Sequence, residues 1–271
     1  MALPRGLGAL KLAAFARPTM SLHDVLLLLL AGFAAGGMNA LAGGGTFFSF
    51  PALLASGLPP VTANATNAVA LWPASLAASW AAREQLRPLG RYVIPLVVMS
   101  LLGGLGGGLL LLAGGDETFR RLIPWLLLAA TLLFAASPWL SRLINRQREA
   151  GSLPPHGPGS HLAHTLVAIY GGYFGAGMGI LQLAAFSIEG HPLLRANALK
   201  NLLSSTIYSV AVVTFVVAGR VSWGELAVLL AAASCGGYAG GALARRLPTR
   251  WLRWLVIAVG TGMTAYYFVT P

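Results

Sequence analysis

The chain of 271 residues has very few charged side chains. Asp, Glu, Lys and Arg make up 9% of it, whereas 56% of its residues are hydrophobic and its mean hydropathy is +0.73. Roughly 25% of the residues in an average soluble protein are charged, so a soluble chain of this length could not cover its surface with so few. The composition excludes a soluble domain and predicts an all-α polytopic membrane protein.

Acids, cysteine and catalytic motifs are scarce as well. The seven acidic residues lie at or near the ends of apolar runs, so a carboxylate proton relay in the middle of a span is not expected. Cys235, the one cysteine, excludes a disulfide framework and a thiol metal site. There is no HExxH, GxSxG or GxxxxGKS/T motif, which argues against an enzyme and against ATP-driven transport by this chain. His156, His161 and His164 have no carboxylate or thiol beside them at ligand spacing, so neither a metal nor a cofactor is predicted.

The net charge of +11 would indicate a nucleic-acid partner if the chain were soluble. The arginines, however, lie mostly between apolar runs, in the segments 83–91, 142–148 and 244–253. This is the distribution of the positive-inside rule, so these segments are predicted to be cytoplasmic and nucleic acid is not an expected partner. The expected partners are the lipid bilayer and a small anionic substrate, and a homo-oligomer is left open.

Apolar runs of spanning length, about 20 residues, recur on both sides of a polar linker. Residues 1–20 form a basic N-terminal segment that we interpret as uncleaved. Residues 21–141 are predicted to be a first transmembrane repeat, 142–161 a cytoplasmic linker and 162–271 a second repeat. About eight transmembrane helices are predicted, near 24–42, 62–82, 90–113, 120–140, 162–181, 196–218, 223–243 and 252–269. Two shorter apolar pieces cannot cross alone and predict broken or re-entrant segments, near 45–56 and 181–189.

The two repeats are copies of one another. A shift of 133 residues places Ala-Asn-Ala at 63–65 on 196–198 and Gly57 on Gly190, and a shift of 134 places the first glycine break on the second. With the arginine-rich segments cytoplasmic, each repeat needs three full spans and a re-entrant pair. This odd number of crossings predicts that the repeats are inverted, and a single broken crossing over 24–57 is the alternative.

Glycines interrupt both repeats after the first apolar run, at Gly43, Gly44 and Gly45 and at Gly177 and Gly179. Glycine accepts positive φ and close backbone approach, and unpaired backbone groups persist in a membrane only where they line a cavity or meet a ligand. Amides at the start of a helix after each break would favour an anion. We therefore predict substrate binding here, with helix packing as the alternative.

A second kind of glycine pattern has a different interpretation. The segments 103–108 and 236–241 each contain pairs of glycines at GxxxG spacing. This spacing lets helix backbones approach closely in a membrane. The prediction for these glycines is helix packing rather than binding.

Polar side chains follow each glycine break at helical spacing. The candidate substrate-binding side chains are Asn39, Asn64, Thr66, Asn67, Asn197, Lys200 and Asn201. Hydrogen bonding between helices is the alternative for any one asparagine, but four in symmetric positions indicate a lined cavity. Lys200 is one of two lysines, and a charge in the centre of a membrane costs about 2.5–3.5 kcal/mol, which points to a function. Snorkelling to the interface is its alternative.

These stretches resemble the TauE/SafE family of membrane transporters, also called the sulfite exporter family. The resemblance rests on AGGGTFFSFPALLASGLPP and ANATN in the first half and on YGGYFGAGMGI and ANALKN in the second, and it covers nearly all of residues 24–269. It implies a multi-pass protein of the inner (cytoplasmic) membrane that moves a small sulfur-containing or carboxylate anion, such as sulfite or a sulfonate. The predicted function is a secondary transporter working by alternating access. A passive anion channel and an accessory membrane subunit are the alternatives.

Overall fold

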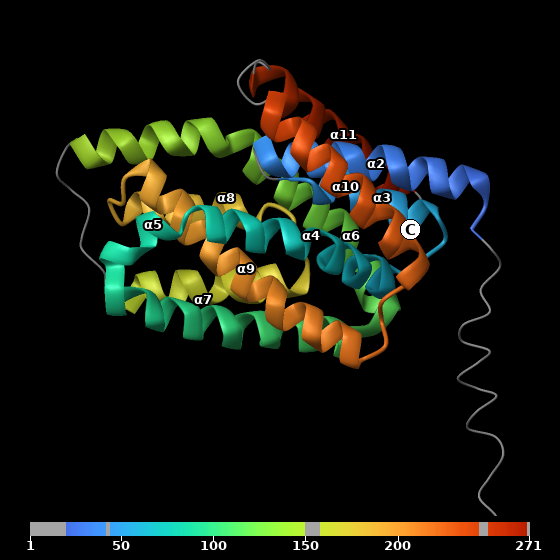
Figure 1. Ribbon diagram of the computed structural model, residues 1–271, viewed down its shortest axis with the longest axis horizontal. Helices are drawn as coiled ribbons and strands as arrows, with labels where there is room; N and C mark the ends of the chain where they lie inside the picture. Colours follow the sequence, from blue (N-terminus) through green and yellow to red (C-terminus); the bar gives the residue numbers. More distant parts are fainter. Residues whose placement is uncertain (1–19, 42–43, 150–157, 244–248, 270–271) are drawn as a thin grey trace, which may run out of the picture.

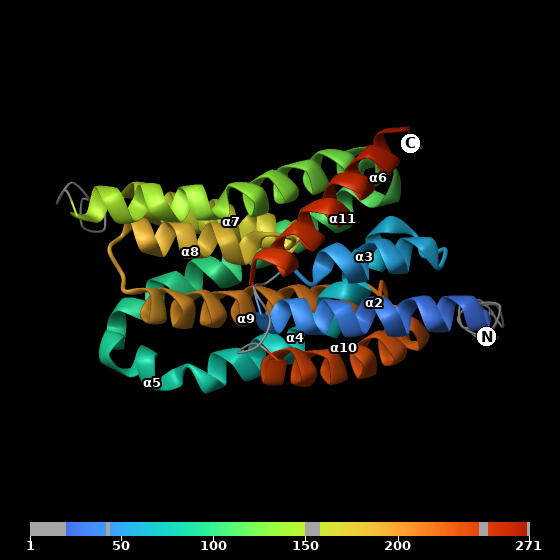
Figure 2. The same ribbon diagram turned by 90° about the horizontal axis from the view of Figure 1, so that it is seen from above.

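The computed structural model describes residues 20–41, 44–149, 158–243 and 249–269, and every regular element in this part of the chain is a helix. The all-α prediction is thereby confirmed. Most of the helices lie alongside one another in a bundle, which α11 crosses obliquely (Figures 1 and 2). The elements are α2 (Leu22–Leu41), α3 (Thr46–Ala55), α4 (Pro60–Ala81), α5 (Arg83–Leu86), η1 (Arg87–Tyr92), α6 (Val93–Glu149), α7 (Pro158–Tyr173), α8 (Met178–Ile188), α9 (Leu193–Val217), α10 (Trp223–Leu243) and α11 (Thr249–Val269).

Three stretches of the described residues are long and apolar enough to cross a membrane: Leu22–Asn39, Arg83–Ala136 and Leu194–Val217. The second of these bends at Gly115, where φ is +68° and α6 divides into two helical parts. Helices α3 and α8 have 10 and 11 residues, and at 1.5 Å per residue they reach only about half of a hydrocarbon core of about 30 Å. The prediction of two apolar segments too short to cross alone is confirmed.

Each short helix ends in the same turn. Gly57 and Gly190 both have a φ of +82°, a backbone conformation that favours glycine, and they lie 133 residues apart. After Gly57, the amide of Leu58 donates to the carbonyl of Leu53, and the corresponding residues after Gly190 repeat this bond. These are the bonds of a Schellman motif, which ends a helix sharply. Proline then caps the next helix in both halves, with nearly identical dihedral angles.

Glycines bring two pairs of helices into backbone contact, which we call the two glycine contacts. Between α6 and α7, a Cβ added at Gly107 would lie 2.0 Å from the carbonyl oxygen of Ile169. Between α2 and α10, a Cβ added at Gly36 would lie 1.9 Å from that of Ala233, and one at Gly236 would meet Phe33 equally closely. The packing role predicted from GxxxG spacing is confirmed for Gly107 and Gly236. Each glycine contact joins a helix of the first half to a helix of the second.

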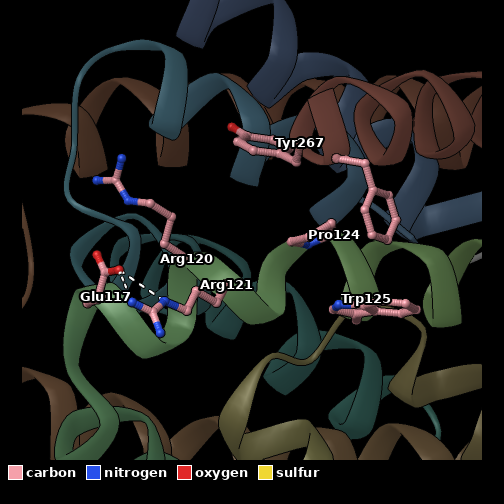
Figure 3. Close-up of a pocket in the computed structure, with 7 residues that line it drawn as sticks. Glu117, Arg120, Arg121, Pro124, Trp125 and Tyr267 are labelled. Carbon is pink, nitrogen blue, oxygen red and sulfur yellow. Dashed lines mark hydrogen bonds and ion pairs between the residues drawn. The ribbon is translucent and has the colours of Figure 1, made fainter. Parts of the chain in front are cut away.

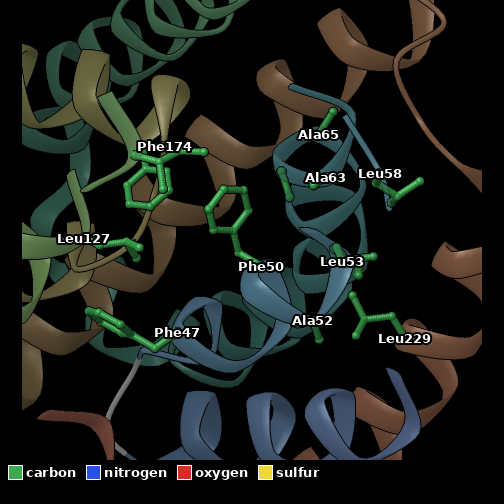
Figure 4. Close-up of a cluster of buried hydrophobic side chains, with 14 of the residues drawn as sticks. Phe47, Phe50, Ala52, Leu53, Leu58, Ala63, Ala65, Leu127, Phe174 and Leu229 are labelled. Atoms are coloured by element: carbon green, nitrogen blue, oxygen red, sulfur yellow. The ribbon is translucent and has the colours of Figure 1, made fainter. Parts of the chain in front are cut away.

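The apolar core lies around α3, whose aromatic side chains pack against α6 and the end of α7 (Figure 4). The ring of Phe50 contacts Phe174 edge to face at 5.4 Å, and Phe47 contacts Phe134 in the same way at 6.2 Å; the rings of Phe50 and Phe119 are tilted at 6.1 Å. Such edge-to-face pairs add about 0.5–1.5 kcal/mol each to the burial of the rings. They pack the beginning of α3, next to the first glycine break, against α6 and the end of α7 in this conformation.

The predicted linker at 142–161 is helical at both ends. Helix α6 continues through Glu149 and α7 begins at Pro158, ahead of the predicted start at 162. The intervening residues 150–157, and residues 1–19 of the predicted N-terminal segment, lie outside the described part of the chain.

Candidate functional site

A cavity of about 540 Å³ lies where the two short helices begin. Its walls come from α2, α4, α9 and α10, together with the turns that lead into α3 and α8. The polar side chains that line it are those of Asn39, Thr46, Ser75, Asn197, Lys200, Asn201, Ser204, Tyr208, Ser234 and Tyr238. Glycines of both breaks therefore line one cavity.

The backbone turns at a glycine in both breaks. Gly44 has a φ of +102° and Gly177 a φ of +76°, so each break contains a glycine in a conformation that other residues rarely adopt. The N-cap residues of α3 and α8 are Gly45 and Gly177, and neither provides a side chain to cap the first-turn amides. The starts of two helices, with their partial positive charge, thus lie at the cavity.

Lys200 is the charged residue of the cavity. Its side chain is half-buried, and its aliphatic part lies along Gly179, where an added Cβ would be 3.4 Å from the Lys200 Cδ. No Asp or Glu is among the described residues that line the cavity. In a region of low dielectric an ammonium group without a neighbouring carboxylate is costly unless an anion accompanies it. The charge of the cavity therefore favours an anionic ligand.

A layer of polar side chains behind the cavity supports the lining. The hydroxyl of Ser204 donates to Gln182 of α8 at 2.7 Å. Asn67 donates to the hydroxyl of Thr46 at 3.4 Å and accepts a short hydrogen bond from Ser49. Because these groups are buried and paired, they fix the hydroxyls at the cavity wall.

The structure brings seven of the twelve predicted residues to the cavity wall: Asn39, Gly44, Gly177, Gly179, Asn197, Lys200 and Asn201. Gly43 lies outside the described residues. Gly45 instead lies against α2: a Cβ added there would be 2.4 Å from the carbonyl oxygen of Ala35, so the two backbones are in contact.

The three remaining predicted residues lie on α4 behind the cavity wall. Asn64 donates to the carbonyl oxygen of Tyr173 at 3.0 Å, at the end of α7. Thr66 accepts a hydrogen bond of 3.0 Å from the amide of Ser222, and Asn67 supports Thr46 as described above. In this conformation these side chains hold helices and lining residues in place and do not reach the cavity.

Tyr208 is a lining residue that was not predicted. It lies on α9 at the end of a stripe that continues from Asn197 through Asn201 and Ser204, at spacings of four, three and four residues. Those spacings place all four side chains on one face of a helix. The stripe was readable from the sequence as a single polar face.

A second cavity, of about 520 Å³, lies between α6 and α11 at the periphery (Figure 3). Arg121 is paired there with Glu117 at 2.9 Å, and the rings of Trp125 and Phe268 meet edge to face at 5.0 Å. Its charged side chains are exposed, and neither glycine break reaches it. The cavity at the breaks is the stronger candidate.

An all-helical membrane protein whose short, broken helices begin at one shared cavity has the architecture of a membrane transporter. The comparison with known families agrees with this class. The model of the family described as sulfite exporter TauE/SafE matches residues 28–267, and the chain belongs to this family.

The chain is also similar to proteins named as transporters. A "Probable membrane transporter protein" of Haemophilus influenzae is 28% identical over 244 residues, which are 89% of this chain and 94% of that protein. The "Probable membrane transporter protein YfcA" of Escherichia coli K12 is 28% identical over 239 residues, 88% and 85% of the two chains. The "Probable membrane transporter protein ORF9" of a Sinorhizobium species is 27% identical over 212 residues, 75% and 77% of the two chains. No solved structure matches the chain with comparable significance.

Proposed function

We propose that the protein is a secondary transporter that moves a small sulfur-containing or organic anion, of the sulfite or sulfonate kind, across the cytoplasmic membrane by alternating access. The observation that carries the proposal is Lys200, in a cavity lined by no acid among the described residues. Membership of the sulfite exporter family supports the substrate class.

The proposed mechanism uses the two breaks as the two sides of one binding site. Asn197, Lys200 and Asn201 would contact the anion from α9, while Gly44 and Thr46 at the start of α3 would line the site from the other half. The proposal includes about eight spans in two inverted repeats, as the arginine distribution predicts. Movement of the short helices about their glycine turns would then open the cavity to one side or the other.

The test is uptake of radiolabelled sulfite and 2-hydroxyethanesulfonate by proteoliposomes that contain the purified protein. Lys200→Gln is expected to weaken the apparent affinity about tenfold to a hundredfold, because hydrogen bonds to charged groups contribute about 1.5–3 kcal/mol. Arg195→Gln is the matched control, since Arg195 lies on the same helix but does not line the cavity. Equal apparent affinities of Lys200→Gln and Arg195→Gln for the anion would refute the assignment of the binding site.

The same vesicles distinguish the alternatives. A transporter shows saturable uptake and counterflow, in which unlabelled anion inside accelerates entry of the label. A passive channel shows neither, and an accessory subunit moves no anion without its partner.

A further inference from the structure

Helices α7 and α8 lie side by side as a hairpin (Figure 2). A cluster of polar and ionisable side chains lies at one end of it. One carboxylate oxygen of Glu189 accepts hydrogen bonds from Ser160 and from His164 Nε2, the latter at 2.7 Å. The other accepts from the hydroxyl of Tyr92 at 3.2 Å, and this hydroxyl also lies 3.2 Å from His191 Nε2. The side chains of Glu189 and His164 are 6% and 1% exposed. We call these five residues the Glu189 cluster.

The Glu189 cluster joins three parts of the molecule. Ser160 and His164 come from the start of α7, Glu189 and His191 from the turn between α8 and α9, and Tyr92 from η1 in the first half. These contacts show that α8 returns to the side from which α7 starts, as expected for a re-entrant pair. The neighbouring arginine-rich segment 83–91 identifies this side as the cytoplasmic one under the proposed topology.

An apolar layer separates the Glu189 cluster from the cavity. The ring of Phe186 lies 4.5 Å from that of His164 and 5.8 Å from that of His191. Phe186 belongs to a buried apolar group with Leu96, Ala196, Leu199 and Leu203. Leu183 packs against this group and also lines the cavity. A change at the Glu189 cluster that shifts α8 would therefore reach the cavity wall through packed side chains.

The hydrogen bonds of the Glu189 cluster define its protonation in this conformation. Burial raises the pKa of the Glu189 carboxyl, but hydrogen bonds from His164, Ser160 and Tyr92 outweigh it and hold the pKa below its ordinary value. An ionised carboxylate only accepts, so His164 Nε2 carries a proton. The Nδ1 atom of the same ring is buried and has no hydrogen-bond partner in the described part of the chain. A second proton on this ring would thus create a buried N–H without an acceptor, which destabilises the present packing.

We propose that the Glu189 cluster is a proton-binding site at the cytoplasmic end of the hairpin, and that its protonation is coupled to movement of α8 and to transport of the anion. The coupling to transport rests on the proposed function. The titratable groups that face Glu189 from other elements, in the described part of the chain, are His164, Tyr92 and His191. Histidines are the side chains that exchange protons near neutral pH, and two of them meet one carboxylate here.

The first test measures proton movement together with anion movement. Proteoliposomes loaded with a pH-sensitive dye receive labelled 2-hydroxyethanesulfonate, an anion that carries no titratable proton near neutral pH. For one coupled proton, a difference of one pH unit across the membrane changes the anion accumulation about tenfold. Glu189→Gln is expected to lose this pH-driven change while counterflow of the anion persists. Glu225→Gln is the control, because Glu225 is a buried acid outside the cluster.

The second test needs no transport. Hydrogen exchange of the α8 amides, corrected for the intrinsic effect of pH, is compared between pH 5.5 and pH 8. We expect the wild type and Glu225→Gln to show faster α8 exchange at the lower pH, and Glu189→Gln to lose that difference.

Two results would refute parts of the proposal. If the wild type transports the anion without moving protons, protonation is not coupled to transport. If the exchange rate of the α8 amides in the wild type is the same at both pH values, the Glu189 cluster is not a proton-binding site that moves α8. If the wild type transports no labelled anion but its α8 amides still exchange faster at pH 5.5, the proposed transport function is refuted and the proton-binding site is not.

Discussion

Replacing Gly107 by alanine tests the glycine contact between α6 and α7 directly. The added Cβ would lie 2.0 Å from the carbonyl oxygen of Ile169 and 2.7 Å from the amide nitrogen of Tyr173. Both are backbone atoms, so no side-chain rotation relieves the overlap. The helices would have to move apart by at least about 1.3 Å to restore an ordinary C···O distance of about 3.3 Å.

The neighbouring glycine on the same helix provides the control. A Cβ added at Gly106 meets nothing within 4 Å. Gly106→Ala should therefore stabilise α6 by about 0.5–1 kcal/mol, because alanine is the better helix former. Gly107→Ala should cost about 1–3 kcal/mol, the usual penalty for overpacking. The two variants are expected to differ by about 1.5–4 kcal/mol.

The assay is the thermal unfolding midpoint of each detergent-purified variant, followed by tryptophan fluorescence. For a chain of this size about 1 kcal/mol corresponds to about 2–4 °C, so Gly107→Ala should melt several degrees below the wild type and Gly106→Ala at or above it. Equal midpoints for the two variants would show that α6 and α7 do not touch along this glycine.

Two further predictions concern buried polar groups. Asn67→Ala removes one hydrogen-bond partner from each of Thr46 and Ser49 and should lower the free energy of unfolding by about 1–3 kcal/mol. Asn201→Ala, on the cavity wall, should cost less in the same thermal melt. For Glu189, a folded-state pKa below the ordinary 4.5 stabilises the protein fully above about pH 4.5, and this contribution disappears as the pH falls through the folded-state value. Melting midpoints measured from pH 7 to pH 3.5 should therefore fall more steeply for the wild type than for Glu189→Gln.

The helix breaks were predictable because glycine and proline act on the backbone locally. Gly57 and Gly190 end the short helices with the same φ, and Pro59 and Pro192 begin the next ones. Hydrophobic length likewise separated the short α3 and α8 from helices that can span. These features depend on residues within a few positions of one another, so a single chain shows them.

The direction in which each polar side chain points was not predictable in the same way. Asn64 and Asn197 occupy corresponding positions, yet Asn64 bonds to the end of α7 whereas Asn197 lines the cavity. The difference arises from how α4 and α9 are rotated against their neighbours, which depends on packing over the whole molecule. Local sequence contains the same Ala-Asn-Ala in both places.

The Glu189 cluster is a second feature that could not be predicted from the sequence. Glu189 lies at the end of an apolar run, a position that ordinarily indicates an exposed acid at the membrane surface. Its partners His164 and Tyr92 are 25 and 97 residues away in the chain. Glu189 is buried because η1 covers the end of the hairpin, a contact that only the three-dimensional structure shows. The three-dimensional contact, not the residue type, makes this carboxylate unusual.

The glycine contacts determine what counts as a folding unit in this chain. The sequence divides into two copies, but α2 of the first copy lies against α10 of the second, and α7 of the second lies against α6 of the first. Either copy alone would leave the glycine face of two helices without a partner. We therefore expect the two halves to fold as one unit and neither half to be stable when expressed alone.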